Sequence, residues 1–159
     1  MRAYDSLHVF PEIPRALQLL QDNNNNNNNK EEGNVTIEAY IFSNGTDEMI
    51  GNSIKTSPEL GPSASVFRSL VTVDGLRCYK PDPRTYDHLV EQAGVKDRKE
   101  DVWVVSANPF DVAGARAFGL KAAFIDRAGK GWIDRIDDTR APSVVARGVD
   151  EAIKSILDY

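Results

Sequence analysis

Apolar runs of strand length alternate with helical segments along this sequence, and that alternation leaves few folds open to the chain. Strands are predicted over residues 35–42, 69–73, 102–105, 122–125 and 143–146. Helices are predicted between or beside them, over residues 14–20, 46–54, 83–93, 111–118 and 149–157. Strands that alternate with helices form a parallel sheet with helices on both faces. The sequence therefore predicts an α/β fold.

Residues with strong positional preferences mark the ends of the predicted helices. Thr46 and Asp82 stand where an N-cap is needed, and Pro83 takes the first helical position after Asp82. Gly94 and Gly119 follow the last periodic residues of two helices, where glycine accommodates a left-handed turn.

Seven consecutive asparagines, residues 23–29, interrupt this pattern and are followed by "KEEGN". The segment has no apolar side chain whose burial would offset the entropy cost of ordering it, so we expect a mobile loop over residues 23–34. The loop separates the helix over residues 14–20 from the strand over residues 35–42. We expect it to have little effect on any chemistry.

The composition excludes several classes of function. The chain of 159 residues is long enough for one domain with a core, and its net charge of −5, without a Lys/Arg cluster, disfavours a nucleic-acid partner. Its single cysteine, Cys78, cannot form an internal disulfide and is more typical of packing than of a nucleophile. No apolar run is long enough to span a membrane, and "MRAYDSLHVFPEIP" is not a signal peptide. A cytoplasmic protein is the default expectation.

Polar side chains follow three of the predicted strands near the point where each strand ends. They are Ser43 and Asn44 after the first strand, Lys80 and Tyr86 beyond the second, and Ser106, Asn108 and Asp111 after the third. Because the carboxyl ends of parallel strands meet at one edge of a sheet, we expect these groups to converge there.

Each of these residues also has a structural explanation. Ser43 and Asn44 fit a turn and cap, Lys80 fits a solvated lysine, and Asp111 fits a helix cap. Together, however, they suit chemistry on an anion. Hydroxyl, amide and helix N-termini bind anions, and a lysine keeps a nearby carboxylate ionised. Asp111 can orient or deprotonate water, but the group has no nucleophile.

Three segments resemble the haloacid dehalogenase superfamily, and specifically its type II 2-haloacid dehalogenases. They are "IFSNGTDEMI", "YKPDPRTY" and "VVSANPFDVAGARAFGLKAAFIDRAG". The resemblance covers the chain from about Phe10 onward and implies a Rossmann-like parallel sheet. It also implies a division of the chain into the end of a helical cap with its return helix, residues 1–22, the asparagine-rich loop, residues 23–34, and a core domain, residues 35–159.

The resemblance implies hydrolysis of the carbon–halogen bond of 2-halo acids to 2-hydroxy acids. In such enzymes an aspartate on the first strand displaces the halide, and water hydrolyses the resulting ester. By resemblance, Ser43 and Asn44 hold the substrate carboxylate and halide, Lys80 holds the nucleophile and Tyr86 shapes the pocket. Ser106, Asn108 and Asp111 then place the lysine and the water. A homodimer is implied and no cofactor is. Magnesium is not implied either, because Ser106 stands where related phosphatases carry an acid.

The sequence departs from the family in its first motif, an apolar strand that ends in Asp-x-x-x-Thr. Asp5 begins a vague Asp-x-x-x-Val, but too few residues precede it for a buried strand. Asp74 and Asp126 follow strands at places that look structural in the family. The cap before Phe10, with its arginine, is missing as well. We therefore expect an N-terminally truncated chain, inactive by itself, with unpaired edges on the strands that end at Ser43 and Ser106.

Three hypotheses remain open at this stage. The chain is a truncated form of a complete dehalogenase, or a non-catalytic remnant that keeps the fold for binding or interaction, or a relative of the magnesium-dependent phosphatases. Ser106 disfavours the third hypothesis.

Overall fold

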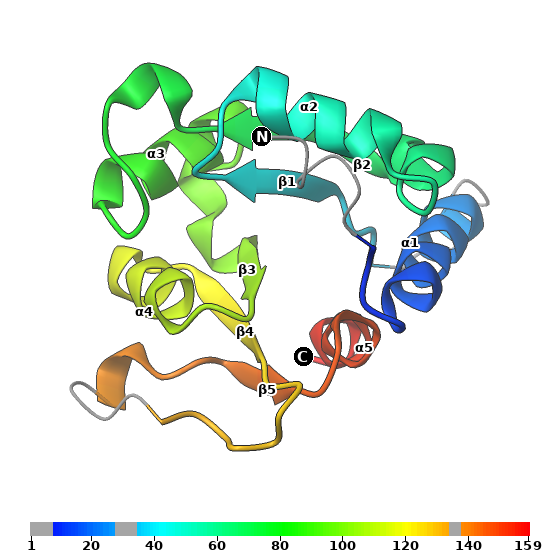
Figure 1. The fold of residues 1–159 in the computed structure, drawn as a ribbon. Coiled ribbons are helices and arrows are strands. Elements are labelled where there is room, and N and C mark those ends of the chain that lie inside the picture. The colour runs from blue at the N-terminus through cyan, green and yellow to red at the C-terminus, as the bar shows by residue number, and fades with distance from the viewer. Residues whose placement is uncertain (1–7, 28–34, 134–137) are drawn as a thin grey trace. The chain divides into compact units, whose positions relative to one another are not determined.

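The computed structural model describes residues 8–27, 35–133 and 138–159, and the chain divides into two compact units, residues 1–72 and 73–159 (Figure 1). Asp5, together with residues 28–34 of the expected loop, lies outside the described residues.

The first unit is built around two parallel strands. Its elements are α1 (Ile13–Asn27), β1 (Ala39–Ser43), α2 (Asp47–Thr56) and β2 (Phe67–Thr72). β1 pairs with β2 so that Ser43 lies opposite Thr72. The Thr72 hydroxyl donates to the Asp47 carboxylate over 2.8 Å, which ties the end of β2 to the first turn of α2. This bond fixes the crossover helix against the strands that it connects.

The second unit contains a three-stranded parallel sheet in the order β3-β4-β5. Its elements are α3 (Pro83–Gln92), β3 (Trp103–Ser106), α4 (Pro109–Phe118), β4 (Lys121–Ile125), β5 (Val144–Ala146) and α5 (Val149–Leu157). Ala152 of α5 packs against Ala123 and Ile125, while α4 lies on the other side of the sheet (Figure 1). The predicted α/β class, with parallel strands and helices on both faces, is confirmed.

The two strands that end at Ser43 and Ser106 belong to different sheets. Among the described residues, β1 pairs only with β2 and β3 pairs only with β4. Each of these strands therefore has an edge without a strand partner, as the sequence predicted.

The helix boundaries follow the predicted signals. The Thr46 hydroxyl accepts a hydrogen bond from the Met49 amide at the start of α2, and the Asp82 carboxylate accepts one from the Arg84 amide at the start of α3. Gly119 closes α4 in the left-handed conformation, with φ of 97°. These signals are short-range, so they act wherever the local chain is free to follow them.

The asparagine run differs from its prediction. α1 continues through Asn27, so a loop that begins at Asn23 is wrong for the first five asparagines. The Asn23 side chain donates to the Val35 carbonyl and accepts from the Ile37 amide, both over 2.9 Å. Once a helix is nucleated, each further residue adds a hydrogen bond, and asparagine costs the helix only about 0.7 kcal/mol relative to alanine. The strand expected from residue 35 begins only at Ala39.

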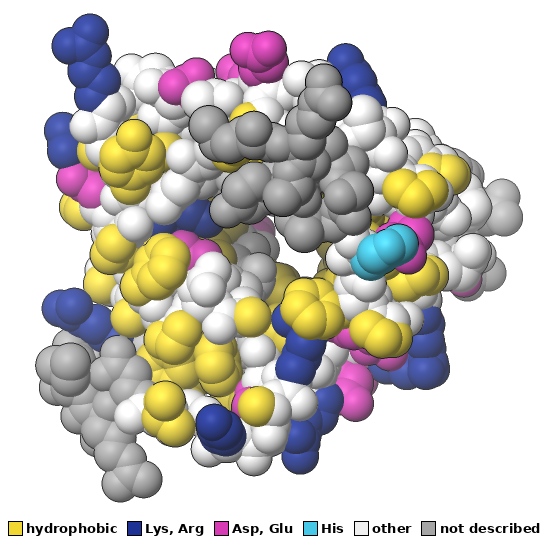
Figure 2. Space-filling view, viewed as in Figure 1, with side chains coloured by type: hydrophobic (Ala, Val, Ile, Leu, Met, Phe, Trp, Pro, Cys, Tyr) yellow, Lys and Arg dark blue, Asp and Glu magenta, His cyan; other side chains and the backbone are white. Residues whose placement is uncertain are grey.

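On the face seen in Figure 2, lysines and arginines lie at several places among apolar and polar side chains, in some places beside acidic ones. Within residues 8–27, 35–133 and 138–159, no helix combines the length and the apolar character needed to cross a membrane.

Candidate active site

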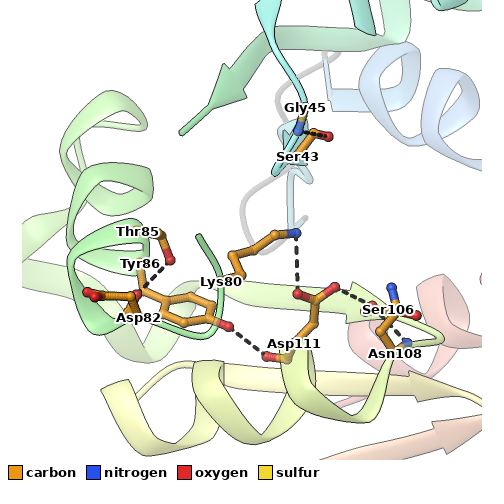
Figure 3. A network of polar contacts seen from close by, with 9 residues as sticks. All are labelled: Ser43, Gly45, Lys80, Asp82, Thr85, Tyr86, Ser106, Asn108 and Asp111. Atoms are coloured by element: carbon orange, nitrogen blue, oxygen red, sulfur yellow. Dashed lines mark hydrogen bonds and ion pairs between the residues drawn. The ribbon is translucent and has the colours of Figure 1, made fainter. Parts of the chain in front are cut away.

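Ser106, Asn108 and Asp111 lie where β3 turns into α4, in the second unit (Figure 3). Ser106 is the last residue of β3, Asn108 is the N-cap of α4 and Asp111 stands in the first helical turn. Pro109 has the φ that the first helical position needs. Asp111, in the first turn, interacts favourably with the positive end of the helix dipole. The local sequence therefore brings these polar side chains together.

The Asp111 carboxylate uses its two oxygens for different partners. Oδ2 accepts a hydrogen bond from the Ser106 hydroxyl over 2.8 Å, and Oδ1 lies 3.4 Å from the Lys80 ammonium nitrogen. The side chain of Asp111 is 6% exposed and that of Lys80 is 9% exposed. Since Asn108 is the cap of α4, the alternative in which Asp111 merely caps its helix is wrong. A buried carboxylate thus holds a buried lysine.

Ser106 is fixed from two sides. Its hydroxyl donates to Asp111 and accepts a hydrogen bond from the Asn108 amide over 3.1 Å. A hydroxyl has one proton to donate, so this arrangement directs that proton at the carboxylate. Asn108 contributes its backbone, while its side chain makes no capping bond and the residue is exposed.

Tyr86 supports the same turn from α3. The residue is fully buried, and its hydroxyl donates to the backbone carbonyl of Asp111 over 3.1 Å. Burial first, and then the neighbouring Asp111 carboxylate, raise the pKa of the Tyr86 phenol, so it stays a neutral donor. The structure therefore uses this hydroxyl to hold the first turn of α4.

Ser43 and Asn44 belong to the first unit, at the end of β1. The Ser43 hydroxyl accepts a hydrogen bond from the Gly45 amide over 3.0 Å, and this bond forms the turn into α2. The turn predicted from the sequence is confirmed. A role for Ser43 and Asn44 in the same site as Lys80 and Asp111 stays a prediction.

A family model for haloacid dehalogenase-like hydrolases matches residues 1–119, three quarters of the chain. The chain belongs to this family.

Two curated relatives agree with this assignment. The chain is 34% identical over 126 residues to haloacetate dehalogenase H-2 of Moraxella sp. (strain B), and 33% identical over 129 residues to (S)-2-haloacid dehalogenase 4A of Burkholderia cepacia. These matches cover 79% and 81% of this chain and 48% of each relative. The chain therefore spans about half the length of the curated relatives that it matches.

Solved structures show the same fold. A crystal structure of a dehalogenase is 27% identical with a TM-score of 0.74, and the match covers 96% of this chain and 58% of that one. The L-2-haloacid dehalogenase of Xanthobacter autotrophicus, 23% identical, has a TM-score of 0.74 and is matched over 98% of this chain and 63% of its own. The resemblance inferred from the three sequence segments is confirmed.

Asp126, a second aspartate at a strand end, is hydrogen-bonded by the loop that follows it. Its carboxylate accepts hydrogen bonds from the amides of Lys130, over 3.0 Å, and Gly131, over 2.6 Å. The Gly131 amide is the largest of the causes that lower the pKa of Asp126. Because both carboxylate oxygens hold backbone amides, Asp126 has the structural role that its place in the family suggested.

Among the residues that the structure describes, no group of three or more His, Cys, Asp and Glu side chains is placed to hold a metal ion. Asp111 instead has a lysine and a serine as partners.

The sequence analysis did not single out Gly114, which lies one turn after Asp111 in α4 and packs against Tyr86. Its one sequence signal is a glycine in the interior of a helix, where alanine is normally preferred.

Proposed function

We propose that this chain supplies the lysine, serine and aspartate of an active site that hydrolyses the carbon–halogen bond of 2-halo acids to give 2-hydroxy acids. The observation that carries the proposal is the buried pair of Lys80 and Asp111, 3.4 Å apart, in a chain of the haloacid dehalogenase-like hydrolase family. The names of the curated relatives, which are haloacetate and 2-haloacid dehalogenases, support this choice of substrate.

The proposed reaction has two steps. A carboxylate oxygen attacks the carbon that bears the halogen, the carbon–halogen bond breaks and the halide leaves, so that an ester joins substrate to protein. Water then attacks the ester carbonyl, which restores the carboxylate and releases the 2-hydroxy acid and a proton. Lys80 would keep the attacking carboxylate ionised, and Asp111 would orient the water and accept its proton.

The remaining predicted residues have supporting roles in this proposal. Ser43 and Asn44, at the end of β1, have the hydroxyl and amide that suit the substrate carboxylate and the halide. Ser106 and Asn108 hold Asp111 in place, and Tyr86 shapes the site through the Asp111 backbone. The reaction as written needs no cofactor.

We further propose that the protein acts in the cytoplasm and as a homodimer. A single, buried cysteine fits a reducing compartment, and the family resemblance supports the dimer.

The attacking carboxylate is the part of this mechanism that the described residues do not supply. Asp126 holds its loop, and Asp74 opens a short turn, Asp74–Leu76. We therefore expect the 159-residue polypeptide to release no halide by itself.

The test is to measure chloride release from 2-chloropropionate. The 159-residue chain would be assayed alone and after co-expression with the part of the Burkholderia cepacia relative that it does not match. We expect release only from the co-expressed pair, and we expect Asp111→Asn to abolish it. Asp97→Asn, which changes an exposed aspartate in the same way, is the matched control.

The other outcomes separate the alternatives. A stable but inactive pair would favour a non-catalytic binding protein. Phosphate release from a phosphomonoester, dependent on magnesium, would favour the phosphatase alternative. Chloride release by the chain alone that Asp111→Asn abolishes would support the dehalogenase function and contradict the expected inactivity.

A further inference from the structure

Gly114 lies where α4 comes close to Pro81, the residue that follows Lys80. A Cβ atom built on Gly114 would lie 2.7 Å from the Cβ of Pro81 and 2.9 Å from Cε2 of Tyr86, and nearer still to the Tyr86 hydroxyl. Ordinary van der Waals contacts of a Cβ begin at 3.4 Å. Even the smallest side chain would therefore force α4 away from Tyr86 and Pro81.

The backbone of Gly114 gives no other reason for a glycine. Its φ is not positive, in contrast to Gly94 and Gly119, so its conformation suits any residue. In a helix interior, glycine is less favourable than alanine because it loses more conformational freedom on folding. The close contact is what accounts for its presence.

The contacts of Gly114 connect it to both members of the buried ion pair. Pro81 directly follows Lys80 in the chain. Asp111 lies three residues before Gly114, on the same face of α4, and its carbonyl accepts the hydrogen bond from Tyr86. Gly114 therefore contacts the residue that follows Lys80 and the tyrosine that donates to the Asp111 carbonyl.

We propose that Gly114 is a positioning residue, whose missing side chain lets α4 seat against Tyr86 and Pro81 and so brings the Asp111 carboxylate to Lys80. This inference rests on the proposed function for its role in catalysis, but the positioning itself is a property of the folded chain. It can therefore be tested without any activity.

The first test compares two Gly→Ala variants of the full chain in denaturant unfolding, followed by tryptophan fluorescence. Trp103 and Trp132 both lie in the second unit, so the signal reports that unit. Gly114→Ala should lower the folding equilibrium constant by roughly 5- to 150-fold, the effect of overpacking a buried contact. Gly75→Ala, with nothing within 4 Å of its added Cβ, should change it by about twofold or less.

The second test asks whether Gly114 positions the ion pair. Lys80→Met, Asp111→Asn and the double variant give the coupling between the two side chains by a double-mutant cycle. We expect this coupling, expressed as an equilibrium factor, to fall by roughly fivefold or more in the Gly114→Ala background and to stay unchanged in the Gly75→Ala background. A merely structural glycine would lower stability and leave the coupling as it is.

The outcomes separate this proposal from the proposed function. Unchanged coupling in Gly114→Ala overturns the positioning role whatever the activity. Lost coupling, in a chain that shows no dehalogenase activity with its co-expressed partner, supports the positioning role and counts against the function. If Gly114→Ala does not fold, Tyr86→Leu in the same chain removes the nearest atoms. Recovery of folding then supports the proposal, and no recovery overturns it.

Discussion

Asp111 is the residue on which the polar contacts of this site meet. Its two carboxylate oxygens serve Ser106 and Lys80, and its backbone carbonyl serves Tyr86. The side chains of Asp111 and Lys80 are 6% and 9% exposed. Burying charged groups is costly unless partners replace the water that they lose. The pairing of these two side chains therefore offsets part of the cost of burying them.

Removal of one member of this pair should cost more stability than its contacts suggest. Asp111→Asn removes the carboxylate charge that lies 3.4 Å from the buried Lys80 ammonium nitrogen, so we expect the free energy of unfolding to fall by about 3–5 kcal/mol. Ser106→Ala removes the hydrogen bond to the charged Asp111 carboxylate and also the acceptor of the Asn108 amide, and we expect it to cost about 1.5–3 kcal/mol. Denaturant unfolding followed by tryptophan fluorescence measures both. Equal losses of unfolding free energy in the two variants would show that the ion pair contributes no more to stability than the Ser106 hydrogen bonds.

Tyr86 should make the protein sensitive to alkali. Its pKa is raised in the folded state, because burial and Asp111 disfavour the phenolate. Below about pH 10 the phenol is neutral in both states. Above that pH the unfolded chain ionises first, so stability should fall by up to about 1.4 kcal/mol per pH unit on account of this one tyrosine. Unfolding measured from pH 9 upward, in about half-unit steps, should give a shallower decline for Tyr86→Phe. Parallel curves would contradict this account.

At the scale of the element, local sequence signals predict where a helix begins and ends better than they predict how far it extends. The caps at Thr46 and Asp82 and the closing Gly119 were predictable, because each acts on amides or carbonyls within a few residues. The extension of α1 into the asparagine run was not predictable from composition. It includes Asn23, whose side chain binds backbone groups at residues 35 and 37.

Among the asparagines that the structure describes, Asn23 should therefore stabilise the first unit. Asn23→Ala removes two hydrogen bonds to the backbone, and we expect the free energy of unfolding to fall by about 1–2 kcal/mol. Asn25→Ala makes the same change at an exposed helical position, where it should be neutral or slightly stabilising. Far-ultraviolet circular dichroism is the suitable signal, since both tryptophans lie in the other unit. Equal effects of the two substitutions would remove this role of Asn23.

The cap of α3 should respond to acid. The pKa of Asp82 is lowered to about 2, first because its carboxylate accepts hydrogen bonds from the Arg84 side chain, and then from the Arg84 amide. A lowered pKa in the folded state means stability that is present above the ordinary value of 3.8 and is lost as the pH falls through about 2. Asp82→Asn keeps an oxygen for the cap and removes the charge. Acid unfolding curves should show a smaller loss for this variant below pH 3.8.

At the scale of the whole molecule, two units each have their own parallel strands, and the chain is acidic. Its net charge is −5, and basic side chains on the face in Figure 2 do not gather into a patch. Binding to a nucleic-acid backbone depends on clustered Lys and Arg that displace counterions. That a nucleic acid is not a partner of this chain therefore stays a prediction, based on its net charge.

We expect the chain not to shift duplex DNA in an electrophoretic assay at physiological salt. A variant with several exposed acidic residues of the second unit changed to lysine would serve as the positive control for the assay. Binding by the unchanged chain that weakens steeply with salt would contradict the prediction.

The sequence by itself determined the order of strands and helices, the caps, and the polar cluster of Ser106, Asn108 and Asp111. These features depend on residues that are close along the chain, where hydrogen-bond and steric preferences act directly. Several segments also carried the family resemblance.

Only the tertiary structure determined which distant residues Asp111 contacts. The contacts of its carboxylate with Lys80, and of its carbonyl with Tyr86, join residues that are distant in sequence. These contacts exist because α4 packs closely against Tyr86 of α3 at Gly114. The spacing of polar residues in the sequence carries no information about how closely two helices pack.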